Sequence, residues 1–152
     1  MINRLIITIA IILVGFQDLS GQEKDEDLNR NGLSIFVGGV TNSDASAFAL
    51  GIDYQYRISK IVGVGLVMDY SFGEIESLLV APALFLHVSA LEFVVAPGME
   101  LSNDDITGII RLGLSYEFEL TERLTLSPSL LFDTERNLEE SIVYGLALGI
   151  KL

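Results

Sequence analysis

His87 is the only histidine in the chain, and a catalytic role for it would need a nucleophile nearby. Ser89 and Ser127 could supply that nucleophile, with the imidazole acting as general base in an acyl transfer. Glu92 or Glu117 could add carboxylates to a metal site at His87, but one imidazole with carboxylates matches no metal-binding motif. A polar residue that is hydrogen-bonded inside the protein is the simpler interpretation. We therefore predict no catalysis, no cofactor and no metal site.

The glycines of this sequence lie in a pattern that indicates strands rather than a nucleotide-binding loop. No GxGxxG or Walker pattern opens a helix, so the GVG of residues 63–65 is not a phosphate loop. It belongs to the stretch IVGVGLVMDYSFG (61–73), in which apolar residues occupy one parity without a break. Strict alternation of this kind predicts a β-strand with one apolar face.

The same alternation recurs about every dozen residues along the chain, with turn residues between the repeats. The predicted strands are 32–41, 46–58, 61–73, 77–88, 91–101, 106–120, 124–134 and 141–152. Eight consecutive strands with short connections predict an antiparallel up-and-down meander, which is enough to close a barrel. The strands are longer than those of globular proteins and match the length of tilted membrane strands. We expect bulges at Gly38–Gly39 and at the mid-strand prolines, Pro82, Pro97 and Pro128.

The face opposite the apolar one decides whether the barrel faces water or lipid. That face is rich in glycine and alanine, such as Gly65, Ala81 and Gly145, whereas the solvent face of a soluble barrel carries long polar side chains. Small residues suit the crowded interior of a narrow barrel. We therefore predict that the apolar face points outward, into lipid.

The aromatic residues of the predicted apolar face support the same assignment. If both termini are periplasmic, these residues fall into two belts around an aliphatic band, as amphipathic rings do at lipid interfaces. The periplasmic belt comprises Tyr54, Tyr56, Phe93, Tyr116 and Phe118. The outer belt comprises Phe48, Tyr70, Phe72, Phe132 and Tyr144.

Ionisable residues of the inner face form two predicted clusters. The cluster near the periplasmic end comprises Asp53, Arg57, His87, Glu92, Glu117, Glu119 and Lys151. The cluster toward the outer end comprises Asp69, Glu100, Arg111 and Asp133. Two interpretations are open: a gated pore or proton path, and a packed plug in which acids and bases pair. We favour the plug, because buried charges must be paired and side chains just fill an eight-stranded barrel.

The N-terminus and the composition bound the cellular context. Residues 1–21 combine a basic start, a 12-residue apolar run (LIITIAIILVGF) and a small-residue exit, which predicts a secretory signal peptide; a retained anchor helix is the alternative. A flexible acidic lead-in (22–31) and a barrel domain (32–152) follow. The net charge of −12 argues against nucleic acid, and the absence of cysteine excludes disulfides.

The signal peptide, the eight-strand meander and the aromatic belts together resemble the small eight-stranded outer-membrane β-barrels of Gram-negative bacteria, of the OmpA/OmpX type. The resemblance covers residues 32–152. It implies insertion by the barrel assembly machinery, contact with outer-membrane lipid and lipopolysaccharide, and a monomer in the outer membrane. In such proteins the last strand usually ends in an aromatic residue; YGLALGIKL keeps the alternation but ends in Leu152.

The predicted fold is thus an all-β, eight-stranded antiparallel transmembrane barrel preceded by a signal peptide. We expect a structural or envelope-stabilising role without catalysis. A soluble periplasmic, lipocalin-like barrel that binds an apolar ligand is the first alternative, and a narrow, porin-like pore is the second. A lipid A-modifying enzyme comes last, because His87 is expected in the lumen at the periplasmic end, whereas the triad of the known barrel deacylases faces lipid near the outer rim.

Overall fold

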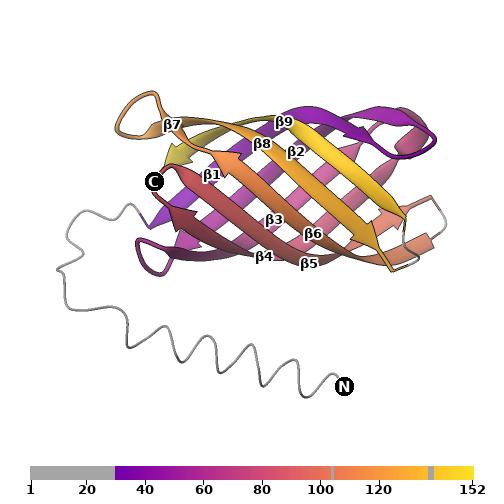
Figure 1. Ribbon diagram of the computed structural model, residues 1–152, viewed down its shortest axis with the longest axis horizontal. Coiled ribbons are helices and arrows are strands. Elements are labelled where there is room, and N and C mark those ends of the chain that lie inside the picture. The colour runs from indigo at the N-terminus through magenta and orange to yellow at the C-terminus, as the bar shows by residue number, and fades with distance from the viewer. Residues whose placement is uncertain (1–29, 104, 137–138) are drawn as a thin grey trace, which may run out of the picture.

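The computed structural model describes residues 30–103, 105–136 and 139–152 (Figure 1). The predicted signal peptide, and all but the last two residues of the predicted lead-in, lie outside these ranges. The strands are β1 (Asn31–Thr41), β2 (Ser46–Arg57), β3 (Val62–Ser71), β4 (Ser77–Val88), β5 (Leu91–Ser102), β6 (Asp105–Tyr116), β7 (Phe118–Glu119), β8 (Leu124–Glu135) and β9 (Glu140–Lys151). A single 3₁₀ turn, η2 (Gly73–Ile75), joins β3 to β4. Within the described ranges, no helix is long and apolar enough to cross a membrane.

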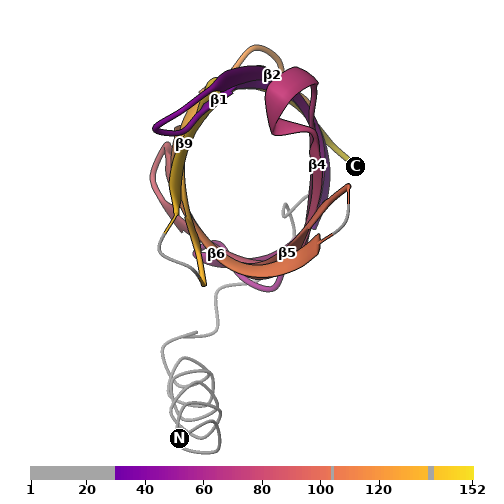
Figure 2. The ribbon, with the colours of Figure 1, turned by 90° about the vertical axis from the view of Figure 1, so that its right-hand side faces the viewer.

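The strands form a closed antiparallel barrel. Each strand from β1 to β5 pairs with the next one along the chain, β9 pairs with both β1 and β8, and β6 pairs with β8 to close the ring. Figure 2 shows this ring along the barrel axis. The two residues of β7 continue β6 along β8, so the wall consists of eight strands. The predicted meander is confirmed, and when β6 and β7 are counted together as the predicted strand 106–120, the strand boundaries differ by at most two residues.

The register of the strands sets a stagger around the barrel. We followed the register partner from each strand to the next around the ring, beginning at Asn31. The successive partners are Tyr56, Val64, Leu84, Val95, Leu112, Phe132, Ile142 and finally Thr41. The path leaves β1 at Asn31 and returns to it at Thr41, ten residues farther along the strand. A stagger of this size tilts the strands by about 35–45° to the barrel axis, as the slanted arrows of Figure 1 show.

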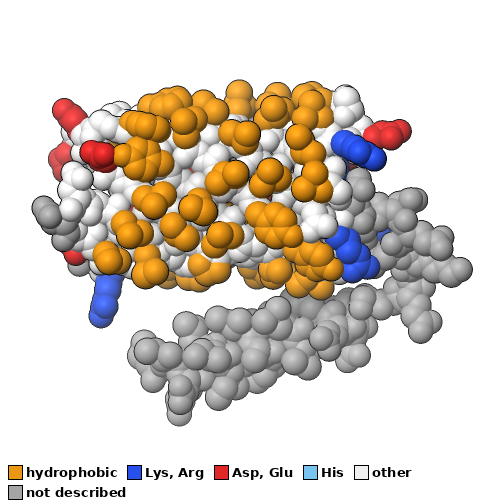
Figure 3. All heavy atoms as spheres, turned by 180° about the vertical axis from the view of Figure 1, so that it is seen from behind, with side chains coloured by type: hydrophobic (Ala, Val, Ile, Leu, Met, Phe, Trp, Pro, Cys, Tyr) orange, Lys and Arg blue, Asp and Glu red, His pale blue; other side chains and the backbone are white. Residues whose placement is uncertain are grey.

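The two faces of the wall differ as the alternation predicts. In β1, for example, Ile35 is 55% exposed while its neighbour Phe36 is 3% exposed. The outer face presents Leu, Ile, Val, Met and aromatic side chains on every strand, and Figure 3 shows them as a broad band between two ends that carry charged side chains. Such an extent of exposed apolar surface is unusual for a protein in water. The apolar side chains therefore point outward, as predicted.

Inside, apolar side chains are buried in two clusters, and glycines make room for one of them. Gly38 and Gly145 are register partners, and the ring of Phe36 lies against both. A Cβ at Gly38 would collide with this ring and with the carbonyl oxygen of Tyr144, and a Cβ at Gly145 would collide with the same ring. The two glycines therefore let a phenylalanine fill the narrow lumen.

The bulges predicted at the glycines and prolines are wrong. β1 keeps one continuous register with both neighbours through Gly38 and Gly39. Pro82 and Pro97 lie opposite each other, and the pairing of β4 and β5 lapses between Val80–Met99 and Leu84–Val95 but resumes in the same register. Proline lacks the N–H that a ladder bond needs, so facing prolines remove bonds without adding a residue to either strand.

Pro128 has the same effect on the sixth strand of the wall. The pairing with β8 lapses between Ser115–Ser129 and Phe118–Leu126, and again resumes in register. The strand predicted at 106–120 is therefore interrupted at Glu117 and appears as β6 and β7.

Candidate functional site: the barrel lumen

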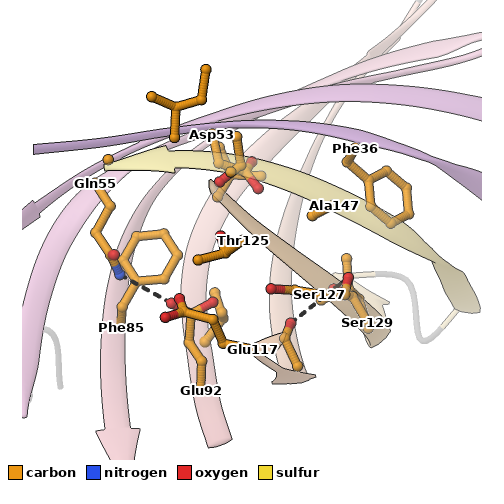
Figure 4. Close-up of a pocket in the computed structure, with 18 of the residues that line it drawn as sticks. Phe36, Asp53, Gln55, Phe85, Glu92, Glu117, Thr125, Ser127, Ser129 and Ala147 are labelled. Carbon is orange, nitrogen blue, oxygen red and sulfur yellow. Dashed lines mark hydrogen bonds between the residues drawn. The ribbon is translucent and has the colours of Figure 1, made fainter. Parts of the chain in front are cut away.

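The lumen contains two small chambers. The larger, of about 80 Å³, is lined by polar residues from several strands together with Phe36 and Phe85. Figure 4 shows Asp53, Gln55, Glu92, Thr125, Ser127 and Ser129 among the residues around it. The smaller chamber, of about 30 Å³, lies toward the end of the barrel opposite the termini. Asp69 and Arg111 belong to the linings of both, so these residues mark the boundary between them.

Arg111, Asp69 and Asp133 form a buried ionic triad at this boundary. Arg111 in β6 and Asp133 in β8 are register partners, and their side chains make a bidentate pair, with Nε to Oδ1 and Nη2 to Oδ2 both at 2.7 Å. The remaining Nη1 donates to Oδ2 of Asp69 in β3, 42 residues away in the sequence. The three side chains are 3% to 6% exposed.

The triad ties three strands of the wall together across the lumen. A guanidinium that binds two carboxylates at once uses donors on all three of its nitrogens, and one cation is shared by two anions. Any ion that moved along the lumen would have to pass between these side chains. The pairing of acids and bases at this level is the arrangement that the plug interpretation requires.

A second, more open ionic network lies at the end of the barrel where Asn31 and Leu152 meet, which we call the terminal end. Lys151 Nζ contacts Glu117 Oε1 at 3.0 Å and Glu119 Oε1 at 2.6 Å, while Arg57 Nη2 lies 3.7 Å from Glu117 Oε2. The side chains of Arg57, Glu117 and Lys151 are 19% to 23% exposed. Glu119, predicted inside the lumen, is 68% exposed at the rim, because β7 extends beyond the enclosed part of the barrel.

His87 belongs to this terminal-end network. Arg57 Nη2 lies 3.2 Å from Nδ1, and since a guanidinium only donates, Nδ1 accepts. Nε2 lies 2.9 Å from the amide nitrogen of Gln55 and 3.4 Å from Glu92 Oε2. Gln55 donates to the same carboxylate oxygen at 3.1 Å. The described contacts of the imidazole are thus with lumen residues.

The candidate nucleophiles do not approach this histidine in a recognisable catalytic arrangement. Ser89 lies in the tight turn after β4 with a positive φ of 58°, and Ser127 lines the larger chamber, where its carbonyl oxygen accepts a hydrogen bond from Ser129. In the part of the chain that the structure describes, no group of three or more histidine and carboxylate residues is placed to hold a metal ion.

Asp53 lies between the two networks rather than at the terminal end. Its carboxylate lines the larger chamber and interacts electrostatically with Asp69, Arg111 and Glu92. Oδ1 is buried and has no hydrogen-bond partner among the described residues. The chamber beside it is large enough for several water molecules, which could satisfy this oxygen.

The remaining predicted site residues lie where the alternation puts them. Glu100 is half-buried and borders the smaller chamber. The belt residues are on the outer face: nine of the ten are exposed and Tyr70 is half-buried. Tyr70 and Phe72 pack edge to face at 4.7 Å, Phe72 lies 5.8 Å from Phe48, and at the other rim Tyr116 and Phe118 are 4.7 Å apart.

Reasoning from charged residues alone missed the neutral polar part of the lumen. Gln55 contacts Glu92, and Ser115 and Ser129 share a hydrogen bond of 2.9 Å between their hydroxyl oxygens. Thr125 is buried in the same chamber. All four have inward parity, so the alternation could have placed them in the lumen, although uncharged polar side chains do not by themselves indicate a site.

Comparison with known proteins supports the fold through structure and not through sequence. Neither a family model nor a curated protein matches the sequence. The N-terminal β-barrel domain of OprF from Pseudomonas aeruginosa matches with a TM-score of 0.57 at 17% identity, over 80% of this chain and 97% of that one. Ail, the attachment invasion locus protein of Yersinia pestis, matches with a TM-score of 0.54 at 12% identity, over 79% and 96%.

A designed protein shows the same likeness. A structure from the de novo design of transmembrane β-barrels matches with a TM-score of 0.52 at 17% identity, over 78% of this chain and 95% of that one. At these identities the likeness concerns the fold alone. This chain has the fold of the small eight-stranded transmembrane β-barrels of bacterial outer membranes.

Proposed function

We propose that this protein is an integral barrel of the bacterial outer membrane, monomeric, with a structural or envelope-stabilising role and without catalysis. The observation that carries the proposal is the distribution of side chains, which is the reverse of that in a water-soluble protein. Apolar side chains face outward all around a closed wall, and buried ion pairs lie within. In hydrocarbon this arrangement keeps the backbone hydrogen bonds within the wall, apart from the lapses at the prolines, and exposes mainly apolar side chains to lipid.

The filled lumen supports a structural role. Binding sites for small molecules usually have volumes of about 300–1,000 Å³, whereas the two lumen chambers measure about 80 and 30 Å³. The turns at the end opposite the termini are short, as between Thr41 and Ser46, and so offer little surface to a protein partner. The proposed partners are outer-membrane lipid and lipopolysaccharide, with the barrel assembly machinery acting during insertion.

The polar lumen argues against a soluble carrier of apolar ligands. A lipocalin-like carrier needs an open apolar cavity inside and a polar surface outside, whereas this wall has an apolar outer surface and its lumen chambers are small and lined in part by charged residues. The position of His87 among Gln55, Arg57 and Glu92 gives equally little support to a lipid A-modifying enzyme.

A narrow pore is a second candidate, because polar chambers lie on both sides of the ionic triad. Planar-bilayer recording would test it. If the triad plugs the lumen, the wild-type protein gives no steady current, and Arg111→Ala increases conductance by joining the two chambers. A steady wild-type current that Arg111→Ala or Glu100→Ala abolishes would favour the pore over the structural role.

Fractionation of the full-length protein tests the main proposal. We expect the protein in the outer-membrane fraction, released only by detergent, with a gel mobility that shifts on heating because a closed barrel resists unfolding by detergent. Recovery in the soluble periplasmic fraction without detergent would overturn the lipid-facing assignment.

A further inference from the structure

The outer face of the barrel contains a groove near the end opposite the termini. It has a volume of about 560 Å³ and crosses β4, β5 and β6, with the end of β8 at its edge. Its apolar lining includes Val80, Pro82, Pro97, Met99 and Ile110. Met99 and Ile110 are each 55% exposed. The groove is therefore a depression in the apolar band and not an opening of the lumen.

Two local features of the sequence create this depression. The facing prolines Pro82 and Pro97 present compact rings where longer side chains line the rest of the band. Gly108 has the parity of the outward residue Ile110, and a Cβ built on it would meet nothing within 4 Å. Bulky neighbours around residues of little volume leave a concave surface.

One basic residue lies at the edge of the groove. The backbone N–H of Arg136 donates to the carbonyl oxygen of Gly108 at 3.0 Å, which fixes Arg136 beside this glycine. Its side chain is exposed and lines the groove. Of the other bases in the described residues, Arg111 lies in the lumen, and the rest are Arg30, Arg57, Lys60, Arg123 and Lys151, which lie in or near the segments of the terminal end.

One acid, Glu135, is next to Arg136 in the chain and borders both the groove and the lumen. Its carboxylate interacts with those of Glu100, Asp133 and Glu139. Arg136 is a cation at the upper edge of a surface that faces hydrocarbon. In a membrane, this is the level at which lipid phosphates lie.

We propose that the groove binds one acyl chain of a phosphate-bearing anionic lipid, with the lipid phosphate on Arg136. The prolines, Met99 and Ile110 contact the chain, and Gly108 leaves the space in which it lies. The guanidinium binds the phosphate through charge-assisted hydrogen bonds, for which its planar fork is suited. The inference rests on the proposed placement of the barrel in a membrane.

Native mass spectrometry of the full-length barrel, extracted in a mild detergent, measures the bound lipid. Phosphatidylglycerol and phosphatidylcholine serve as anionic and zwitterionic probes. Arg136→Gln should weaken retention of phosphatidylglycerol by about tenfold, the loss expected for one charge-assisted hydrogen-bonded contact. Gly108→Leu should weaken retention of both lipids, because its side chain fills the groove.

Matched controls separate the site from general effects of charge and bulk. Arg123→Gln removes an exposed charge from the turn after β7, and Ser46→Leu adds an apolar side chain at the exposed start of β2. Both should retain lipid as the wild type does. Equal retention by wild type, Arg136→Gln and Gly108→Leu would overturn the proposal, as would an equal loss in the controls.

The gel shift on heating shows whether each variant has folded, and Arg136→Gln still tests the site if Gly108→Leu fails to fold. A barrel that fractionates with the membrane but keeps no lipid in the groove contradicts only this inference. Recovery as a soluble protein contradicts the proposed function itself.

Discussion

The two ionic networks of the lumen use the same kinds of residues in different ways. In the triad, one guanidinium serves two carboxylates, and all three side chains are 3% to 6% exposed. In the terminal-end network, two bases share Glu117 at 3.0 and 3.7 Å, and the side chains are about one-fifth exposed. The first network is shielded from water and includes a bidentate pair, whereas the second has access to water and its contacts range from 2.6 to 3.7 Å.

The difference between the two networks follows from their exposure to water. A charge removed from water must have its partners supplied by the protein, and the loss of one partner leaves the other charges buried and unpaired. At a hydrated rim, water replaces a lost partner, so individual pairs contribute little. We therefore expect the triad to dominate the contribution of lumen charges to stability. Four measurements test this difference between the two networks.

Arg111→Ala should have the largest effect. It leaves Asp69 and Asp133 buried without a cation, which should lower the free energy of unfolding by about 3–5 kcal/mol. Urea titration of the barrel in lipid vesicles measures the change. Arg111→Met combined with Asp69→Asn and Asp133→Asn should recover much of the loss, because no unpaired charge stays buried. A change below about 1 kcal/mol for Arg111→Ala would contradict the comparison.

Asp133→Asn should have an intermediate effect. The amide keeps the shape of the carboxylate but replaces one of its two acceptors with a donor that faces the guanidinium, at a cost of about 2–3 kcal/mol. The same titration applies, with Glu122→Gln in an exposed turn as the matched neutralisation. If the two variants lost equal stability, burial would not distinguish the triad.

Arg57→Gln should cost no more than about 1 kcal/mol, because its pair with Glu117 is partly exposed and Lys151 still contacts that carboxylate. Unfolding by urea in the same vesicles gives the value. A loss as large as that of Asp133→Asn would show that the terminal-end network is as tightly coupled as the triad.

Salt should have the smallest effect and should act on one network only. An increase from 0.1 to 1 M NaCl shortens the Debye length from about 10 to about 3 Å. The stability difference between wild type and Arg57→Gln should then shrink toward zero, while the difference for Asp133→Asn should stay. Equal salt sensitivity of both differences would mean that water reaches the triad.

The strands and their faces could be read from the sequence, but the contacts inside could not. The parity of Asp69, Arg111 and Asp133 placed all three in the lumen near one level. Nothing local predicted that Arg111 would bind both aspartates, or that Asp53 would interact electrostatically with Asp69 and Arg111. Glu119 has inward parity as well, yet it is exposed because β7 runs past the rim.

The prolines show the same limit. A proline in a strand predicts a lost ladder bond, and the sequence suggested bulges as the remedy. Only the register showed that Pro82 faces Pro97, so that both losses fall at one place and no extra residue is needed. The groove at Gly108 depends on the same register, because it brings together residues of four strands.

Which residues face outward, and that eight strands follow one another, could be predicted from the sequence, because the face of a residue depends only on its parity within its strand. The tertiary structure decided which inward residues meet. The ten-residue stagger between Asn31 and Thr41 results from all the pairings that close the ring. It is this stagger that brings Asp69 to Arg111 across 42 residues of sequence, and no single strand contains it.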